Sequence, residues 1–143
     1  MPFDNKDTNS NTKGIRGIAN AMFRILTSFG SNKPMQIRKI TDNYSVSGQI
    51  TPTDVALIKA AGFKTIMCNR PDGESNGQPT ADMIKQIAKD HDMNFRYVPM
   101  SPRGLGATTL DDFAEVISKE PGPVFAYCRS GNRCTILWNA TQN

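Results

Sequence analysis

The chain has 143 residues and an ordinary globular composition, with 38% apolar and 21% charged residues. This length suffices for one domain with a hydrophobic core but not for two. The net charge of +4 comes mostly from the first 33 residues, and the remainder is close to neutral. This distribution argues against a domain that binds nucleic acid.

The chain contains three cysteines, Cys68, Cys128 and Cys134. An odd number without a secretory leader argues against a disulfide framework and predicts a reducing, cytoplasmic location. The polar start of the chain lacks the features of a signal peptide, and no apolar run approaches the ~20 residues of a membrane span. We therefore expect a cytoplasmic protein with free thiols.

Two segments precede the expected domain at 35–143. Residues 1–12 are rich in Asp, Asn, Ser and Thr, which predicts a disordered tail. Residues 13–30 carry apolar side chains at helical spacing and predict an amphipathic helix. Residues 13–29 of this helix would pack on the domain or on a second subunit. The alternative is a basic helix that lies on a membrane surface or targets an organelle.

From residue 35 onward, short apolar runs alternate with segments of helical periodicity. Strands are expected at 36–40, 44–47, 65–68, 94–99 and 124–127, and helices are expected to begin at Thr51, Pro79, Thr109 and Cys134. The second of these helices should face the core with Met83, Ile84, Ile87 and Ala88. This alternation predicts an α/β fold with a mainly parallel sheet and helices on both faces.

Three loops are expected to converge on one site, because ligands of such sheets bind beyond the carboxyl ends of the strands. These loops are 69–78, 100–108 and 128–133. The last of them is the most informative. It begins at Cys128, directly after an apolar strand, and ends at Arg133, close to the start of a helix.

The order of strand, loop and helix places the Cys128 thiol where free N–H groups and the helix dipole favour negative charge. Small and turn-tolerant residues in the loop allow its amides to form an anion-binding nest, which Arg133 can close. Such surroundings lower a cysteine pKa from ~8.5 to ~3.5–7.5 and make the thiolate a nucleophile. An inert buried cysteine is the alternative, but the neighbouring Arg133 favours the reactive one.

Four residues separate Cys128 from Arg133. Cysteine phosphatases use a longer cradle that is sized for a phosphoryl group, whereas a tighter ring suits one sulfane sulfur, as in sulfurtransferases of the rhodanese kind. Phosphatases also need a general acid for the leaving oxygen, usually on the preceding strand–helix loop. That loop, 100–108, contains no carboxylate, so only Asp72 or Glu74 could serve.

Several separated motifs occur in order: Val46-Ser47-Gly48-Gln49-Ile50 followed by Thr51-Pro52, then Asn69-Arg70-Pro71-Asp72-Gly73-Glu74, Gln78-Pro79, and Tyr127-Cys128-Arg129-Ser130-Gly131-Asn132-Arg133. In these motifs the chain, from about residue 35 to its C-terminus, resembles the phosphatase-like domain of the bacterial beta-lactamase hydrolase-like family. The resemblance implies a dual-specificity-phosphatase fold, which occurs alone or fused to a metallo-β-lactamase-type persulfide dioxygenase. Members of the family are described both as phosphatases and as sulfurtransferases.

The resemblance also assigns roles to individual residues, and it makes residues 70–74 the neighbouring wall of the site. The catalytic residues would be Cys128 as nucleophile, Arg133 as loop arginine and Asp72 as candidate acid, and the substrate-binding residues would be Arg129, Ser130, Gly131, Asn132 and Arg70. No metal or cofactor is expected. The single histidine, His91, lies in a charged helix end, and a metal site would need several converging ligands.

Two positions depart from the family pattern. Cys134 stands where the family usually has Ser or Thr, and a thiol is a weaker donor to the thiolate than a hydroxyl. This change disfavours turnover of a phosphoenzyme. Cys134 could instead resolve an oxidised Cys128, or it is only a small helix residue. Cys68 stands where the family more often has Asn, and a buried structural thiol is the simplest interpretation.

These features predict a sulfurtransferase. The Cys128 thiolate would attack the sulfane sulfur of a small anionic or persulfide donor, such as thiosulfate or a glutathione persulfide, and pass it to an acceptor thiol. The first alternative is a phosphatase that hydrolyses phosphomonoesters or phosphotyrosine through a phosphocysteine. The second alternative is a non-catalytic domain that senses anions or binds a partner.

Overall fold

The computed structural model describes residues 35–142, so the predicted tail at 1–12 and helix at 13–30 lie outside the described residues. The described chain forms one five-stranded sheet in the order β1-β2-β5-β3-β4. Its strands are β1 (Arg38–Thr41), β2 (Tyr44–Ser47), β3 (Thr65–Cys68), β4 (Asn94–Tyr97) and β5 (Val124–Tyr127). β1 pairs antiparallel with β2, and the other pairs are parallel. The predicted α/β class with a mainly parallel sheet is confirmed.

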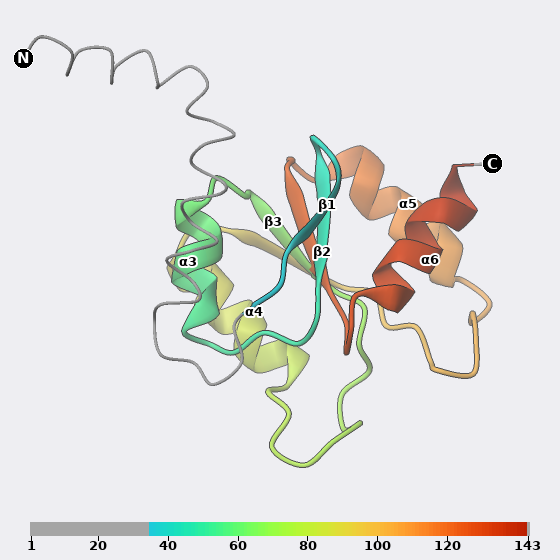
Figure 1. Ribbon diagram of the computed structural model, residues 1–143, viewed down its shortest axis with the longest axis horizontal. Coiled ribbons are helices and arrows are strands. Elements are labelled where there is room, and N and C mark those ends of the chain that lie inside the picture. Colours follow the sequence, from blue (N-terminus) through green and yellow to red (C-terminus); the bar gives the residue numbers. More distant parts are fainter. Residues whose placement is uncertain (1–34, 143) are drawn as a thin grey trace, which may run out of the picture. The chain divides into compact units, whose positions relative to one another are not determined.

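Four helices of the described chain cover the sheet: α3 (Asp54–Ala60), α4 (Ala81–Asp90), α5 (Thr109–Lys119) and α6 (Asn132–Thr141). Helices α3 and α4 lie on one face, and α5 and α6 lie on the other (Figure 1). Within residues 35–142, none of the helices has the length and apolar character needed to cross a membrane.

Three helices, α3, α4 and α6, begin at other residues than predicted. α3 begins at Asp54 rather than at Thr51, because the turn before it is closed by backbone bonds that span only three residues, from the Asp54 N–H to the Thr51 carbonyl (3.0 Å) and from the Val55 N–H to the Pro52 carbonyl (3.3 Å). The Asp54 carboxylate accepts the Thr51 N–H (2.8 Å) and hydroxyl (3.1 Å), as in a capping box. α6 begins at Asn132, two residues before the predicted Cys134, since Gly131 has a positive φ of 93° and caps the helix. The prediction for α4 is nearly right, with Thr80 as the residue that caps it.

The predicted core stripe of α4 is partly wrong. Ala81, Ile84 and Ala88 are buried, whereas Met83 is 46% exposed. The three buried residues follow one another at intervals of three and four, which defines a narrow stripe. Met83 lies beside this stripe.

The centre of the sheet is buried on both faces, since every residue of β2, β3 and β5 is buried. The aromatic ring of Tyr44 stacks on Trp138 at 4.7 Å and meets Phe113 edge-on at 5.7 Å, which joins the sheet to α5 and α6. Cys128 and Cys134 belong to the same core cluster as these rings. The predicted reactive loop is therefore built directly on the core.

Candidate active site

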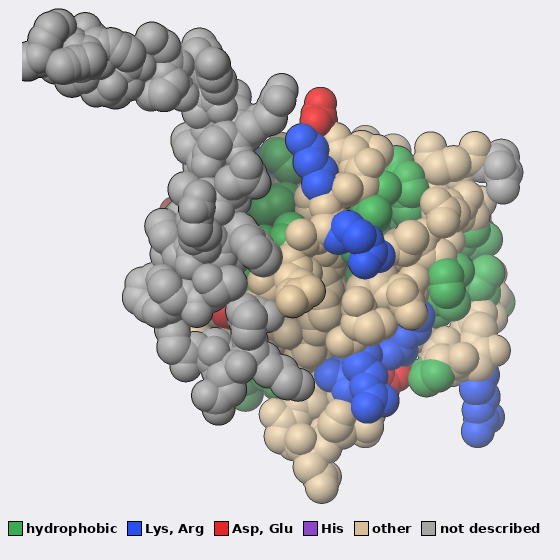
Figure 2. Space-filling view, viewed as in Figure 1, with side chains coloured by type: hydrophobic (Ala, Val, Ile, Leu, Met, Phe, Trp, Pro, Cys, Tyr) green, Lys and Arg blue, Asp and Glu red, His purple; other side chains and the backbone are tan. Residues whose placement is uncertain are grey.

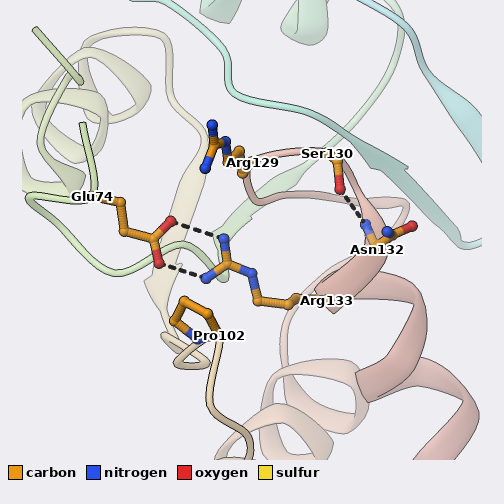
Figure 3. Close-up of a pocket in the computed structure, with 6 residues that line it drawn as sticks. All are labelled: Glu74, Pro102, Arg129, Ser130, Asn132 and Arg133. Carbon is orange, nitrogen blue, oxygen red and sulfur yellow. Dashed lines mark hydrogen bonds and ion pairs between the residues drawn. The ribbon is translucent and has the colours of Figure 1, made fainter. Parts of the chain in front are cut away.

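The three loops predicted to converge do meet at the carboxyl ends of the parallel strands (Figure 1). Backbone hydrogen bonds hold them together: the Asn69 N–H donates to the Tyr127 carbonyl at 2.8 Å, and the Met100 N–H donates to the Asn69 carbonyl at 3.0 Å. A pocket of about 460 Å³ opens between the loops and is lined by Glu74, Pro102, Arg129, Ser130, Asn132 and Arg133 (Figure 3).

The Cys128 thiol lies at the base of the loop and is fully buried. The Gly131 N–H donates to its sulfur at 3.0 Å. The pKa of Cys128 is lowered to about 5, first by a hydrogen bond from the Cys134 thiol and then by the N–H groups of Cys134, Ser130 and Gly131, against the opposing effect of burial. Cys128 is therefore a thiolate at neutral pH, as a nucleophile of this kind requires.

Cys134 supports this thiolate from the first turn of α6. Burial, followed by the hydrogen bond to Cys128, raises the pKa of Cys134 well above its ordinary value, so it stays protonated. The Tyr44 hydroxyl donates to the Cys134 carbonyl at 2.8 Å and fixes this turn. A protonated thiol is a donor and a poor attacking group. The structure thus favours a donor role for Cys134 over the resolving role considered from the sequence.

Two glycines allow the loop to adopt this shape. Gly131 has a φ of 93°, which directs its N–H toward the Cys128 sulfur. A Cβ at Gly48 would lie 2.9 Å from the Arg129 carbonyl oxygen, so only glycine permits the segment after β2 to approach the loop this closely. The neighbouring Gln49 N–H donates to the same oxygen at 3.4 Å.

Arg133 and Glu74 form a bidentate ion pair across the pocket (Figure 3). Nη1 of Arg133 lies 2.7 Å from Oε2, and Nη2 lies 2.8 Å from Oε1. Nη1 also donates to the Met100 carbonyl at 2.8 Å. The hydrogen bond from Arg133, opposed by burial and aided by Arg70, lowers the pKa of Glu74 to about 2. Glu74 is thus ionised at neutral pH and cannot act as a general acid there.

Arg70 and Asp72 are not among the described residues that line the pocket, although Arg70 contacts one of them, Glu74. Arg70 is 4% exposed and donates to Glu74 (3.0 Å), Gln49 (2.9 Å) and Ser75 (2.7 Å). Asp72 accepts the Ala81 N–H at 2.7 Å, at the start of α4. In these positions Arg70 shapes the loop at 69–78 and Asp72 anchors a helix. The substrate-binding and catalytic roles expected of them stay predictions.

Cys68 lies at the end of β3 and is 2% exposed. Its thiol donates to the Arg70 carbonyl at 3.2 Å, and burial raises its pKa to about 11. This agrees with a structural thiol. Across residues 35–142, no three or more His, Cys, Asp or Glu side chains are grouped so that they could hold a metal ion.

Sequence reasoning missed the main partner of Arg133. The sequence indicates Glu74 as a candidate acid and as part of the wall at 70–74, but not as the partner of Arg133. Gln49 and Pro102 were not singled out for the site, yet Gln49 binds Arg70 and Pro102 lines the pocket. The only signal for these residues was their position next to the ends of the strands.

Residues 36–143 match the model of one protein family, described as the beta-lactamase hydrolase-like protein, phosphatase-like domain. The chain belongs to this family. A beta-lactamase hydrolase-like protein from Agrobacterium fabrum is 32% identical over 104 residues, which are 73% of this chain and 24% of that protein. The chain thus spans about a quarter of the length of the curated relatives it matches.

Solved structures agree with this assignment. A candidate phosphatase from Neisseria meningitidis is 36% identical, with a TM-score of 0.68 over 74% of this chain and 75% of that one. The core catalytic domain of a PP-IP phosphatase from S. cerevisiae is 15% identical, with a TM-score of 0.59 over 78% of this chain and 68% of that one, and shows the fold alone. The predicted cysteine-phosphatase-like fold and the predicted class, an enzyme with a cysteine nucleophile, are confirmed. The family description and the name of the Neisseria structure both mention a phosphatase, and neither mentions sulfur transfer.

Proposed function

We propose that the domain is a sulfurtransferase that carries a sulfane sulfur on Cys128. One observation carries this proposal: the short loop directs its amides at the Cys128 sulfur itself, with the Gly131 N–H at 3.0 Å. Amides in this position suit the sulfur chain of a persulfide, whereas a phosphoryl group needs donors arranged around a larger tetrahedron.

The reaction would proceed in two displacements. With thiosulfate as donor, the Cys128 thiolate attacks the outer sulfur, the sulfur–sulfur bond breaks, and sulfite leaves with the electron pair. An acceptor thiolate then attacks the outer sulfur of the Cys128 persulfide and releases Cys128 as a thiolate. The second leaving group is stabilised by the same hydrogen bonds that lower the pKa of Cys128.

Neither displacement needs a proton donor, because sulfite and a low-pKa thiolate leave as anions. This agrees with the surroundings of the pocket. Glu74 is held ionised by Arg133, and the loop at 100–108 contains no carboxylate. Arg133 also places a positive guanidinium at the pocket wall, where negative charge gathers on the donor.

The test is the intact mass of the purified chain after treatment with thiosulfate or glutathione persulfide. We expect a gain of one sulfur atom that is absent from Cys128→Ser and discharged by an added thiol. Cys134→Ser is the matched control and should still load. A chain that gains no sulfur, or that gains it equally in Cys128→Ser, would refute the proposal.

The second candidate is a phosphatase, which the family name and the Neisseria structure favour. Here Cys128 would attack phosphorus and form a phosphocysteine that water hydrolyses. Since Glu74 cannot donate a proton at neutral pH, such an enzyme would act best on aryl phosphates, whose leaving groups depart without one. Hydrolysis of an aryl phosphate above the Cys128→Ser background, without sulfur loading, would establish this candidate in place of the first.

A further inference from the structure

Arg129 differs from Arg133 and Arg70 because its side chain has no protein partner within residues 35–142. Arg133 and Arg70 both donate to Glu74, so one carboxylate is shared by two guanidinium groups. Arg129 is exposed, lines the pocket, and stands apart from the Glu74–Arg133 pair (Figure 3). Among the described residues, the pocket therefore holds a guanidinium without a protein partner, which can bind a ligand.

The backbone of Arg129 is fixed even though its side chain is free. Its carbonyl oxygen accepts the Gln49 N–H, and the close approach of Gly48 holds the same peptide. Arg129 also follows Cys128 directly in the chain. The start of the side chain is thus held next to the nucleophile, and Arg129 lines the same pocket as Ser130, Asn132 and Arg133 of its loop.

Electrostatics explains why a guanidinium without a protein partner would be useful near the Cys128 thiolate. An anionic substrate that approaches an ionised cysteine is repelled, and an unpaired guanidinium at the same pocket offsets that repulsion. Basic side chains gather at the lower part of the face shown in Figure 2, with little acidic surface beside them. A guanidinium binds sulfonate, carboxylate and phosphate oxygens through paired N–H groups.

We propose that the Arg129 side chain binds an oxyanion group of the substrate outside the Cys128 loop and so selects anionic substrates over neutral ones. This inference rests on the proposed function in taking Cys128 as the nucleophile, but it holds for transfer of either sulfur or phosphate. Arg129 is thereby a specificity-determining residue, distinct from Arg133, which belongs to the loop's own ion pair.

The test compares two alkylating reagents that attack the same thiolate, the anionic iodoacetate and the neutral iodoacetamide. Their rate ratio at Cys128 cancels any change in the pKa of that thiol. In Arg129→Gln we expect the ratio of iodoacetate to iodoacetamide to fall about tenfold, with partial recovery in Arg129→Lys. Arg103→Gln is the matched control, because it removes an exposed charge from a neighbouring loop without touching the described lining of the pocket.

An unchanged ratio in Arg129→Gln, or an equal fall in Arg103→Gln, would overturn the inference. A chain that gains no sulfur in the loading assay but keeps the Arg129-dependent ratio would refute sulfur transfer alone. A chain that loads sulfur without any dependence of the ratio on Arg129 would refute this inference alone. Failure of both reagents to label Cys128 would refute the two proposals together.

Discussion

The loops at 69–78 and 128–133 lie at the same end of the sheet and share arginine, serine, glycine and asparagine. They differ in where their hydrogen-bond donors point. In the loop at 69–78, polar side chains bind one another, as Arg70 binds Glu74 at 3.0 Å. In the loop at 128–133, backbone N–H groups point at the sulfur of Cys128.

This difference shows that composition does not separate a scaffold loop from a reactive one. The two kinds of loop differ in the acceptors that their hydrogen-bond donors contact. Donors that are satisfied within their own loop make it rigid, whereas donors aimed at one buried sulfur stabilise a charge on it. The two loops meet in the ion pair of Glu74 with Arg133, where the rigid loop holds the arginine of the reactive one.

Of the changes considered, weakening the ion pair between Arg133 and Glu74 should have the largest effect, and it should act on turnover. Arg133→Lys keeps the positive charge but cannot make both bonds to Glu74, which measure 2.7 Å and 2.8 Å. We expect turnover by Cys128 to fall about hundredfold, since the positive charge near the reacting atoms is no longer held in one position. Steady-state kinetics with thiosulfate or an aryl phosphate checks this. Turnover within about twofold of wild type would mean that the two loops work independently.

Removing the Glu74 carboxylate tests how much this residue stabilises the loop at 69–78. Glu74→Gln leaves Arg133 and Arg70 without a charged partner and should lower the free energy of unfolding by about 2 kcal/mol at pH 7. The pKa of Glu74 is depressed to about 2, so its contribution is present above the ordinary value of ~4.3 and is lost as pH falls toward 2. Urea unfolding at pH 7 and pH 3 should therefore show less acid dependence in the variant.

Asp72→Asn is the matched control for this prediction. The amide oxygen of the new side chain can still accept the Ala81 N–H, so we expect a stability loss of about 0.5 kcal/mol or less. Sulfur loading should be unaffected. A marked drop in aryl phosphate turnover in Asp72→Asn would instead support the acid role predicted from the sequence.

Substitution of Cys134 tests how the loop at 128–133 lowers the pKa of Cys128. Cys134→Ala removes the donor that contributes most to the low pKa of Cys128 and should raise that pKa by about one to two units. Alkylation of Cys128 with iodoacetamide over pH 4–9 measures the shift. Cys134→Ser restores a donor and should keep the pKa close to that of the wild type. Equal pKa values in the alanine and serine variants would show that the loop amides alone hold the thiolate.

The smallest effect comes from paired glycine substitutions in the two loops. Gly131 has a φ of 93° and Gly77 a φ of 76°, so alanine at either position should cost about 1 kcal/mol in thermal or urea unfolding. Only Gly131→Ala should also raise the pKa of Cys128, because the Gly131 N–H donates to its sulfur and Gly77 belongs to the other loop. A pKa change of the same size in Gly77→Ala would erase the distinction between the loops.

Much of the fold was predictable because its signals are local. The apolar runs that form β3 and β5, and the Thr80 cap of α4, can be recognised within a few residues of sequence. The later start of α3 could not be predicted, since it depends on the first turn being closed by backbone bonds that span three residues rather than four. The exposure of Met83 depends on how α4 is rotated against the sheet, which tertiary packing decides.

The candidate site was predictable in its nucleophile but not in its surroundings. Cys128 and the direction of its pKa shift follow from strand, loop and helix order, which are contiguous in the chain. The bond between Glu74 and Arg133 joins residues 59 positions apart, and only the sheet order brings them together. The burial of Arg70 is likewise a long-range result, because Gln49 supplies one of its acceptors.

The central claim is that this loop holds Cys128 as a thiolate, and the most direct test is the pH dependence of Cys128 alkylation in the wild-type chain. The rate constant for iodoacetamide should rise with pH, reach half of its plateau near the lowered pKa of about 5, and remain constant above it. A midpoint near the ~8.5 of a free cysteine would contradict the account. It would show that the loop does not hold Cys128 as a thiolate at neutral pH.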